Sequence, residues 1–289
     1  MFLFKNKFRL CELFGIPIYL DFSLLFLLLF FLTGPGSVET GLLCAVLLLV
    51  SITVHELAHA LTARAFGFAT RDITLSLLGG CASLIALPRK AWQEFCTALA
   101  GPLASVGISL LAMALLSAAS ANAGFGGAAL FVIEDSIRSF GIDLDIAGPF
   151  KVELAMLPLA NVAFYLATMN MMLAIFNMLP GFPMDGGRVF RSLMRQFTSR
   201  VNATFAAMVV GRAVAVLIGL RGIVAMTRGG NWGFVSVLIA WMIWQEGYRE
   251  YLQVCRESGW GRAWNDWRAK VSPPPYGGDG DEYDVTRNG

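Results

Sequence analysis

Charged side chains are scarce in this chain of 289 residues: 15% of its positions are charged and 56% are apolar. Its mean hydropathy is +0.64. Because a soluble domain carries about 25% charged residues, the composition is typical of a protein that crosses a membrane several times. The net charge of +2, without a basic tract interleaved with aromatic residues, argues against nucleic-acid binding.

Cysteines are few, odd in number and scattered, and none of the five forms a Cys-x-x-Cys pair. This spacing supports neither a disulfide framework nor a cysteine zinc site. Histidine is scarcer still, since the chain has only two. Any metal site built on histidine must therefore use His55, His59 or both.

Both histidines lie in one window, His-Glu-Leu-Ala-His, at the end of an apolar run from Leu42 to Val54. Two histidines four residues apart share one face of a helix, so both rings can reach one ion. The side chain of Glu56 cannot point toward the same ion equally well, because Glu56 is next to His55 in the helix. Glu56 is therefore predicted to act on a metal-bound water. The alternative, a pair of buried polar residues that only form hydrogen bonds, is disfavoured because a membrane helix rarely carries two His and a Glu without a function.

Runs of about 20 apolar residues predict an all-α membrane protein with about six transmembrane helices. A positively charged start, Lys5 to Arg9, resembles a signal peptide, but Asp21 interrupts the first run and no cleavage site follows, so we expect a retained span. The predicted spans lie near residues 15–33, 41–65, 93–118, 154–179, 202–226 and 232–252.

The remaining segments define the domain boundaries. We expect residues 1–254 to form one transmembrane core that includes an extracytoplasmic loop at 119–153. Residues 255–289 would form a cytoplasmic juxtamembrane segment, with an interfacial helix around Trp260, Trp264 and Trp267, and a disordered tail from Ser272.

Positive charge is unequal between the two sides of these spans, and the richer side is predicted to be cytoplasmic. Arg138, Lys151 and Arg228 fall on the poorer side. Both termini and the His55 end of the second span are then cytoplasmic. The richer side carries Lys5, Lys7, Arg9, Arg64, Arg71, Arg89, Lys90, Arg188, Arg191, Arg195 and Arg200.

The stretch 70–88 is too short and too polar to span and alternates loosely around Gly79 and Gly80, which predicts a small membrane-associated β-hairpin. Irregular backbone at membrane depth is tolerated where it packs on protein or lines a wet cavity. The hairpin either walls a site beside the His helix or is a surface loop, and the sequence leaves both open.

A catalytic zinc ion needs a third protein ligand, and no histidine remains for that role. Among the few acidic residues in or next to the spans, Asp185 has the best context. Pro180 and Pro183 stop the preceding helix, and Gly186 and Gly187 allow a sharp bend. Such a broken segment can return a carboxylate toward the second span. A solvated aspartate in an ordinary turn is the alternative.

Together the His55–His59 window and the Asn177–Gly187 stretch resemble the two signatures of the site-2 protease family of intramembrane zinc metalloproteases. Ala100-Gly101-Pro102 also matches a family feature, and the resemblance covers roughly residues 10–250. The chain looks like a minimal form, without a PDZ-like insertion or a C-terminal nucleotide-sensing domain.

The resemblance implies hydrolysis of a peptide bond within a transmembrane substrate near the cytoplasmic face, with one Zn²⁺ per chain. It implies that Glu56 is the catalytic base and that His55, His59 and Asp185 are the metal ligands. Substrate-binding roles follow for Asn177, Asn170, Gly79 and Gly80, the last two within a hairpin to which a substrate strand would pair. The implied partners are a single-span membrane protein, the lipid bilayer and a separate regulatory membrane protein. The absence of organelle signals and the compact size favour a prokaryotic plasma membrane.

Two other classes of protein remain as alternatives. A CaaX-type membrane protease would need a glutamate ligand from a second helix, and no suitable element follows His59. A metal-binding transporter would be expected to show internal repeats or charges over several spans, and the sequence shows neither. A catalytically silent scaffold would tolerate loss of Glu56, yet Glu56 is present together with all three candidate ligands.

Overall fold

A computed structural model describes residues 7–33, 37–76, 79–84, 90–119, 124–139, 158–227 and 233–258. Its elements follow the order β1 (Lys7–Leu13), β2 (Ile16–Asp21), α1 (Leu24–Thr33), α2 (Val38–Ala65), β3 (Thr70–Ser76), β4 (Gly79–Leu84), α3 (Ala91–Ala119), α4 (Gly124–Ser139), α5 (Pro158–Asn177), α6 (Asp185–Met194), α7 (Arg200–Thr227) and α8 (Gly233–Glu257).

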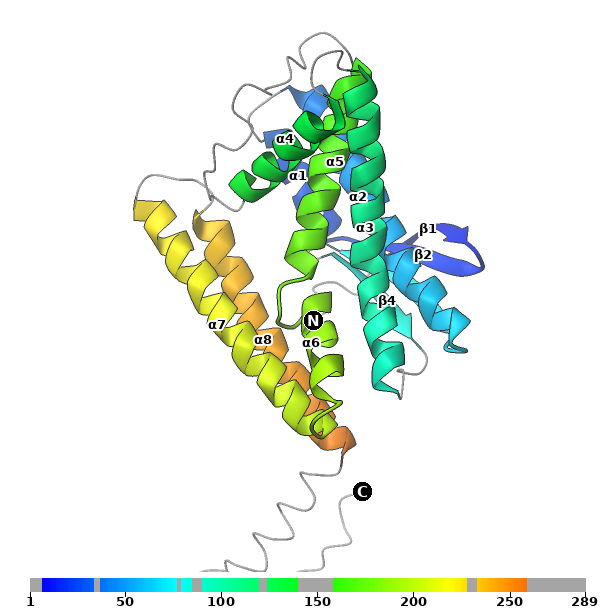
Figure 1. The fold of residues 1–289 in the computed structure, drawn as a ribbon, viewed down its shortest axis with the longest axis vertical. Coiled ribbons are helices and arrows are strands. Elements are labelled where there is room, and N and C mark those ends of the chain that lie inside the picture. The colour runs from blue at the N-terminus through cyan, green and yellow to red at the C-terminus, as the bar shows by residue number, and fades with distance from the viewer. Residues whose placement is uncertain are drawn as a thin grey trace, which may run out of the picture.

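Three helices are long and apolar enough to cross a membrane: α2, α3 and α7. The apolar part of α5, Val162–Asn177, is shorter. Figure 1 shows α2, α3 and α5 as one bundle, with α7 and α8 side by side and leaning away from it. The structure thus supports a mostly helical membrane protein, in which the described residues give fewer clear spans than the six predicted.

The first predicted span, 15–33, is wrong in its first half. Residues Ile16–Asp21 form strand β2, and α1 has only ten residues. Phe14 and Gly15 both have positive φ and make the tight turn that reverses the chain from β1. A short apolar run does not reveal whether its residues are strand or helix, and here two β-branched residues, Ile16 and Ile18, alternate toward the core.

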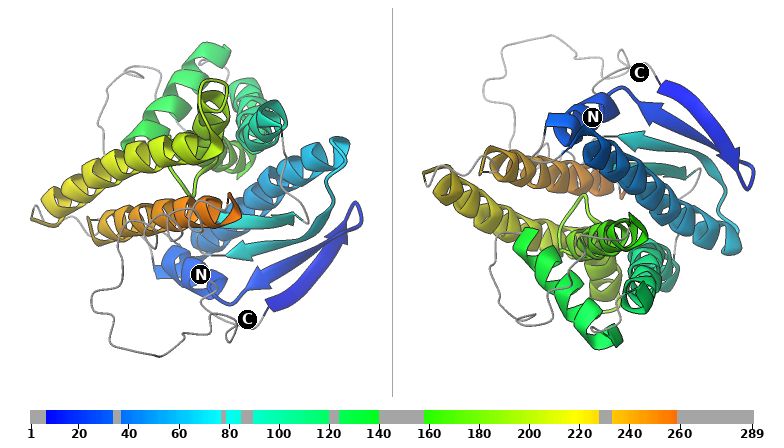
Figure 2. Two further views of the ribbon diagram at one scale, coloured as in Figure 1. Left: turned by 90° about the horizontal axis from the view of Figure 1, so that it is seen from below. Right: turned by 90° about the horizontal axis from the view of Figure 1, so that it is seen from above.

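The N-terminal strands extend the predicted hairpin into a four-stranded sheet of order β1-β2-β3-β4, so the fold is not all-α. The hairpin itself is confirmed, since β3 and β4 pair antiparallel, while β2 joins β3 in parallel. Figure 2 shows the sheet beside α2. The packed residues are Ile16, Ile18, Ile73 and Leu75 from the sheet and Ile52, Leu57 and Ala60 from α2.

The sequence predicts a loop over 119–153, but part of this segment forms the helix α4. Ala128 and Val132 of α4 pack against Met113 and Leu116 of α3 and Ala167 of α5. This apolar contact is the reason that part of the segment is a helix. Residues 140–157, including the first four residues of the predicted span 154–179, lie outside the described residues.

The last helix passes the expected boundary at residue 254, because α8 continues to Glu257. The three tryptophans of the predicted interfacial helix and the tail from Ser272 lie outside the described residues. At the opposite end of α8, Gly233 packs on Gly222 of α7: a Cβ on Gly233 would lie 2.4 Å from the Gly222 carbonyl oxygen. Small residues therefore let these two helices approach closely.

The short helix α6 lies below α5 in Figure 1, between α3 and the lower ends of α7 and α8. Ten residues make a marginal helix in isolation, so α6 depends on its neighbours. Its place brings Asp185 back toward α2.

Candidate metal centre

Helix α2 carries the first two predicted ligands one turn apart. His55 and His59 are both buried, and their rings meet edge to face with centroids 4.8 Å apart. Their Nε2 atoms point the same way, since both contact the same carboxylate oxygen of Asp185. The two Nε2 atoms therefore face one point, as the i, i+4 spacing predicts.

Asp185 reaches this point from the first residue of α6. Its Oδ2 lies 3.1 Å from Nε2 of His55 and 3.0 Å from Nε2 of His59. Two glycines make the approach feasible. A Cβ on Gly186 would lie 2.3 Å from the carbonyl oxygen of Leu179, and one on Gly187 would lie 2.6 Å from the carbonyl carbon of Gly181. The bend after α5 therefore has no room for a side chain at either position.

Helix α3 supplies no ligand, but it holds both rings at their second nitrogen. Nδ1 of His59 lies 2.7 Å from the backbone oxygen of Thr97, and Nδ1 of His55 lies 2.9 Å from Oγ of Ser105. A carbonyl oxygen only accepts, so His59 donates from Nδ1 and its Nε2 keeps a lone pair when the ring is neutral. Such a partner fixes the tautomer that binds a metal.

Gly101 of α3 faces the same point. A Cβ built on it would lie 2.2 Å from Nε2 of His59 and 2.6 Å from Nε2 of His55. Only a residue without a side chain leaves the ligand atoms uncovered on this side. Pro102 follows inside the helix and removes the hydrogen bond to the carbonyl of Ala98, which loosens this turn of α3.

Together His55, His59 and Asp185 form a group whose ligand atoms all lie within 4.8 Å of one another, all of it buried. A neutral His59 lone pair aimed at a carboxylate oxygen is repulsive unless a cation lies between them, and an uncompensated buried carboxylate is costly. Two imidazoles and one carboxylate are also a donor set of catalytic zinc sites. The chemistry of the residues therefore fits Zn²⁺.

Glu56 lies beside His55 with 9% of its surface exposed. Its carboxylate interacts electrostatically with His59, Asp185 and Arg188. Within the described part of the chain it accepts no hydrogen bond from a protein group. Its oxygens are therefore available to a small polar molecule at the centre.

The predicted substrate residues lie apart from the three ligands. Asn170 of α5 is fully buried, and its Nδ2 donates to Oγ of Ser51 at 2.8 Å and to the carbonyl of Leu166 at 2.9 Å. Asn177 is half-buried and donates to the carbonyl of Leu173. Gly79 begins β4, where Gly80 pairs with Leu75 of β3. None of these contacts tests a role in substrate binding.

Sequence reasoning missed the supporting groups. The Thr97 carbonyl carries no sequence signal at all, and Ser105 is one hydroxyl among many. A stronger signal lay in Glu94, a carboxylate near the start of a predicted span, which pairs with Arg191 and Arg195. A small polar cleft of about 120 Å³ lies nearby, lined by Phe182, Pro183, Arg188, Glu246, Arg249, Glu250 and Gln253.

Two buried histidines on the apolar helix α2 and one buried carboxylate on the short helix α6 define a candidate metal centre of a membrane protein. Residues 43–220, more than half of the chain, match the model of Peptidase family M50. The chain belongs to this family of metallopeptidases.

Individual relatives agree with the family match. The chain is 31% identical over 259 residues to "Putative zinc metalloprotease sll0528" of a Synechocystis strain, covering 83% of this chain and 59% of that protein. It is 32% identical over 227 residues to "Putative zinc metalloprotease Rip3" of Mycobacterium tuberculosis, covering 78% of this chain and 48% of that protein. The chain thus spans about half the length of these relatives.

A solved structure shares the fold. The site-2 protease from Methanocaldococcus jannaschii matches with a TM-score of 0.55 and 25% identity, over 85% of this chain and 95% of that one. The predicted resemblance to the site-2 protease family is confirmed by the family model and by this structure.

Proposed function

We propose that this chain is an intramembrane zinc metallopeptidase that hydrolyses a peptide bond in the transmembrane segment of a membrane protein. The observation that carries the proposal is the convergence of His55, His59 and Asp185 beside Glu56, a carboxylate to which no group of the described residues donates a hydrogen bond. No other cluster of three or more candidate ligands occurs among the described residues. The family match supports the same chemistry.

The residues have distinct roles in this proposal. His55, His59 and Asp185 hold the ion, which when bound supplies an acidified water and polarises a carbonyl. Glu56 accepts the proton of the attacking water and returns it to the leaving amine. The bonds from Thr97 and Ser105 keep both rings in one orientation, so the ligands need no rearrangement when substrate arrives.

Substrate presentation is assigned to the β3–β4 hairpin. A helical substrate has its carbonyls in hydrogen bonds and must unwind before cleavage. β4 is an edge strand of the described sheet and packs on α2, the helix that carries both histidines. An unwound segment that pairs with β4 near Gly79 and Gly80 would be held extended beside the centre. Asn177 and Asn170 remain proposed contacts.

The cytoplasmic assignment also has support from the fold. The centre lies in the C-terminal half of α2. Figure 1 shows the ends of α3, α6, α7 and α8 gathered at one end of the molecule. This end carries Arg191, Arg195, Arg200, Arg249 and Arg256, and positive charge favours the cytoplasmic side. We assign both termini to that side of a prokaryotic plasma membrane, with a single-span protein as substrate and a separate membrane protein as regulator.

The decisive experiment is cleavage of tagged single-span substrates in liposomes by wild type, Glu56→Gln and Glu39→Gln, with zinc measured on each sample. Glu39 lies on the same helix, exposed in its first turn, and serves as the matched control. We expect all three proteins to hold zinc, and only Glu56→Gln to lose cleavage. Equal cleavage by Glu56→Gln would refute its role. Zinc in every protein without cleavage would favour a silent scaffold.

Strand pairing is tested separately by proline at successive positions of β4. Alternate residues of an edge strand direct their N–H into the ladder or away from it. Proline at the outward positions should lower cleavage while thermal stability is kept, and proline at the inward positions should lower stability. Cleavage that survives proline at every outward position would remove the pairing step.

A further inference from the structure

One face of α3 contacts both histidines of the metal centre and the helix α6, which carries Asp185, without donating a ligand. Glu94, Thr97, Gly101 and Ser105 are spaced by three, four and four residues, the spacing of a single helix face. Thr97 and Ser105 hold the histidine rings, and Gly101 leaves the ligand atoms uncovered. The remaining member of the face, Glu94, contacts neither histidine.

Glu94 instead binds the helix that carries the third ligand. Its Oε1 lies 2.7 Å from Nε of Arg191 and 2.5 Å from Nη2, so the guanidinium is held through two nitrogens. Its Oε2 accepts from Arg195 at 2.7 Å. Arg191 is 3% exposed and Glu94 is 8% exposed. Water competes little at this depth, so the pair is geometrically strict.

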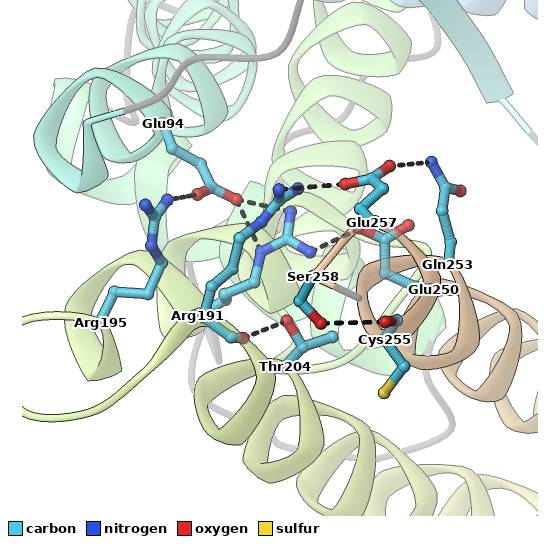
Figure 3. A network of polar contacts seen from close by, with 10 residues as sticks. Glu94, Arg191, Arg195, Thr204, Glu250, Gln253, Cys255, Glu257 and Ser258 are labelled. Carbon is cyan, nitrogen blue, oxygen red and sulfur yellow. Dashed lines mark hydrogen bonds and ion pairs between the residues drawn. The ribbon is translucent and has the colours of Figure 1, made fainter. Parts of the chain in front are cut away.

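Arg191 has further contacts that fix its position. Its Nη1 lies 2.5 Å from Oε1 of Glu250 on α8. Its guanidinium lies 4.9 Å from the ring centroid of Phe182, in the turn before α6. Figure 3 shows the side chains of α3, α6 and α8 meeting around Arg191. The charged groups are thus compensated, and the end of α6 is tied to two long helices.

Helix α6 connects the contacts of Arg191 to the metal ligand Asp185. Asp185 is the first residue of α6, and Arg191 follows six residues later in the same ten-residue element. Near Asp185 the helix is fitted to the preceding turn through Gly186 and Gly187. A shift at Arg191 therefore moves Asp185 relative to the two histidines, which belong to α2 and are held by Thr97 and Ser105 of α3.

We propose that Glu94 is a positioning residue: through Arg191 it fixes α6 so that Asp185 meets His55 and His59 at one metal ion. The inference rests on the proposed function, because it assumes that these three residues are the ligands. It assigns to α3 the alignment of all three ligands. Glu94 itself touches neither metal nor substrate.

The test measures metal binding rather than cleavage. Purified full-length protein in detergent is titrated with a zinc chelator of known affinity, and a cobalt-substituted sample gives the absorption spectrum of the site. The variants are Glu94→Gln and Arg191→Lys. Glu257→Gln is the matched control. Glu257 forms an ion pair with Arg200 in the same region of Figure 3, but this pair connects only α7 and α8. Measurements use the monodisperse fraction of each variant.

We expect Glu94→Gln to weaken zinc binding by about 10-fold to 100-fold, the usual effect of losing a group that orients a ligand, and to alter the cobalt spectrum. Arg191→Lys keeps the charge but loses the forked contact, so its loss should be intermediate. Glu257→Gln should bind zinc as wild type does.

Unchanged zinc affinity and cobalt spectrum in both Glu94→Gln and Arg191→Lys would overturn the inference, even if their stability falls. An equal loss in Glu257→Gln would also overturn it, since the effect would then be general. If Glu94→Gln does not fold, Arg191→Lys decides by the same two measurements. Zinc binding that responds as expected in a protein that cuts nothing would support the positioning role and refute the proposed activity.

Discussion

Gly101→Ala is the sharpest perturbation of the metal centre because it adds one carbon and removes nothing. The new Cβ would lie 2.2 Å from Nε2 and 2.5 Å from Cε1 of His59, and 2.6 Å from Nε2 of His55. Both rings must therefore move. They cannot move freely, since Thr97 and Ser105 hold them from behind.

The size of the effect follows from what the movement disrupts. Turning a side chain about 30° from its rotamer costs roughly 0.5–1.5 kcal/mol, and losing a hydrogen bond costs about 0.5–1.5 kcal/mol. With two rings and two bonds, the loss is about 2–6 kcal/mol. If it falls on the metal-bound state, zinc affinity drops by roughly 30-fold to 10⁴-fold.

The assay is chelator competition on purified protein, with Gly107→Ala as control. Gly107 lies on the same helix, and a Cβ there would meet nothing within 4 Å. Both substitutions raise helix propensity by about 1 kcal/mol, so only the contact with the histidines differs. Zinc binding by Gly101→Ala within threefold of Gly107→Ala would refute the geometry of the centre.

Three further predictions test neighbouring contacts. Ser105→Ala should lower zinc affinity by about 10-fold because His55 loses its Nδ1 partner, whereas Ser109→Ala, which breaks a bond to the carbonyl of Ala167, should lower thermal stability and leave zinc binding unchanged. Asn170→Ala should lower the melting temperature, because it leaves Ser51 without this donor; a loss of cleavage at full stability would instead favour substrate contact. Removing zinc with a chelator should abolish cleavage, and adding it back should restore activity; activity that persists in metal-free protein would exclude a metallopeptidase.

The ligand positions could be read from the sequence because each depends on local chemistry. The i, i+4 spacing places both histidines on one face of a helix. The Pro and Gly residues around Asp185 predict that the preceding helix ends there and that the chain turns back toward α2. The structure brings these three residues together. Their catalytic roles stay predictions.

Other parts of the fold depend on partners far away in the chain. Ile16–Asp21 directly precedes the apolar run of α1, so the sequence predicts one span over both, whereas its pairing with β1 and β3 makes it a strand. The segment of α4 is predicted to be a loop because residues 119–153 are Gly/Ala-rich at first and then acidic. Its apolar residues form a helix face that packs on Met113 and Ala167, and the sequence alone does not show this contact. His59 donates a hydrogen bond to the backbone oxygen of Thr97. Every residue has such an oxygen, so the sequence does not reveal this contact.

The distance along the chain between the two halves of the centre has a consequence for biosynthesis. His59 and Asp185 are 126 residues apart. A ribosome that adds about 5–20 residues per second needs roughly 6–25 s to cover this interval. During that time the nascent chain carries a histidine pair but no third ligand. A chain with the proposed activity would therefore be unable to cleave neighbouring segments at the insertion site before its own second half has entered the bilayer.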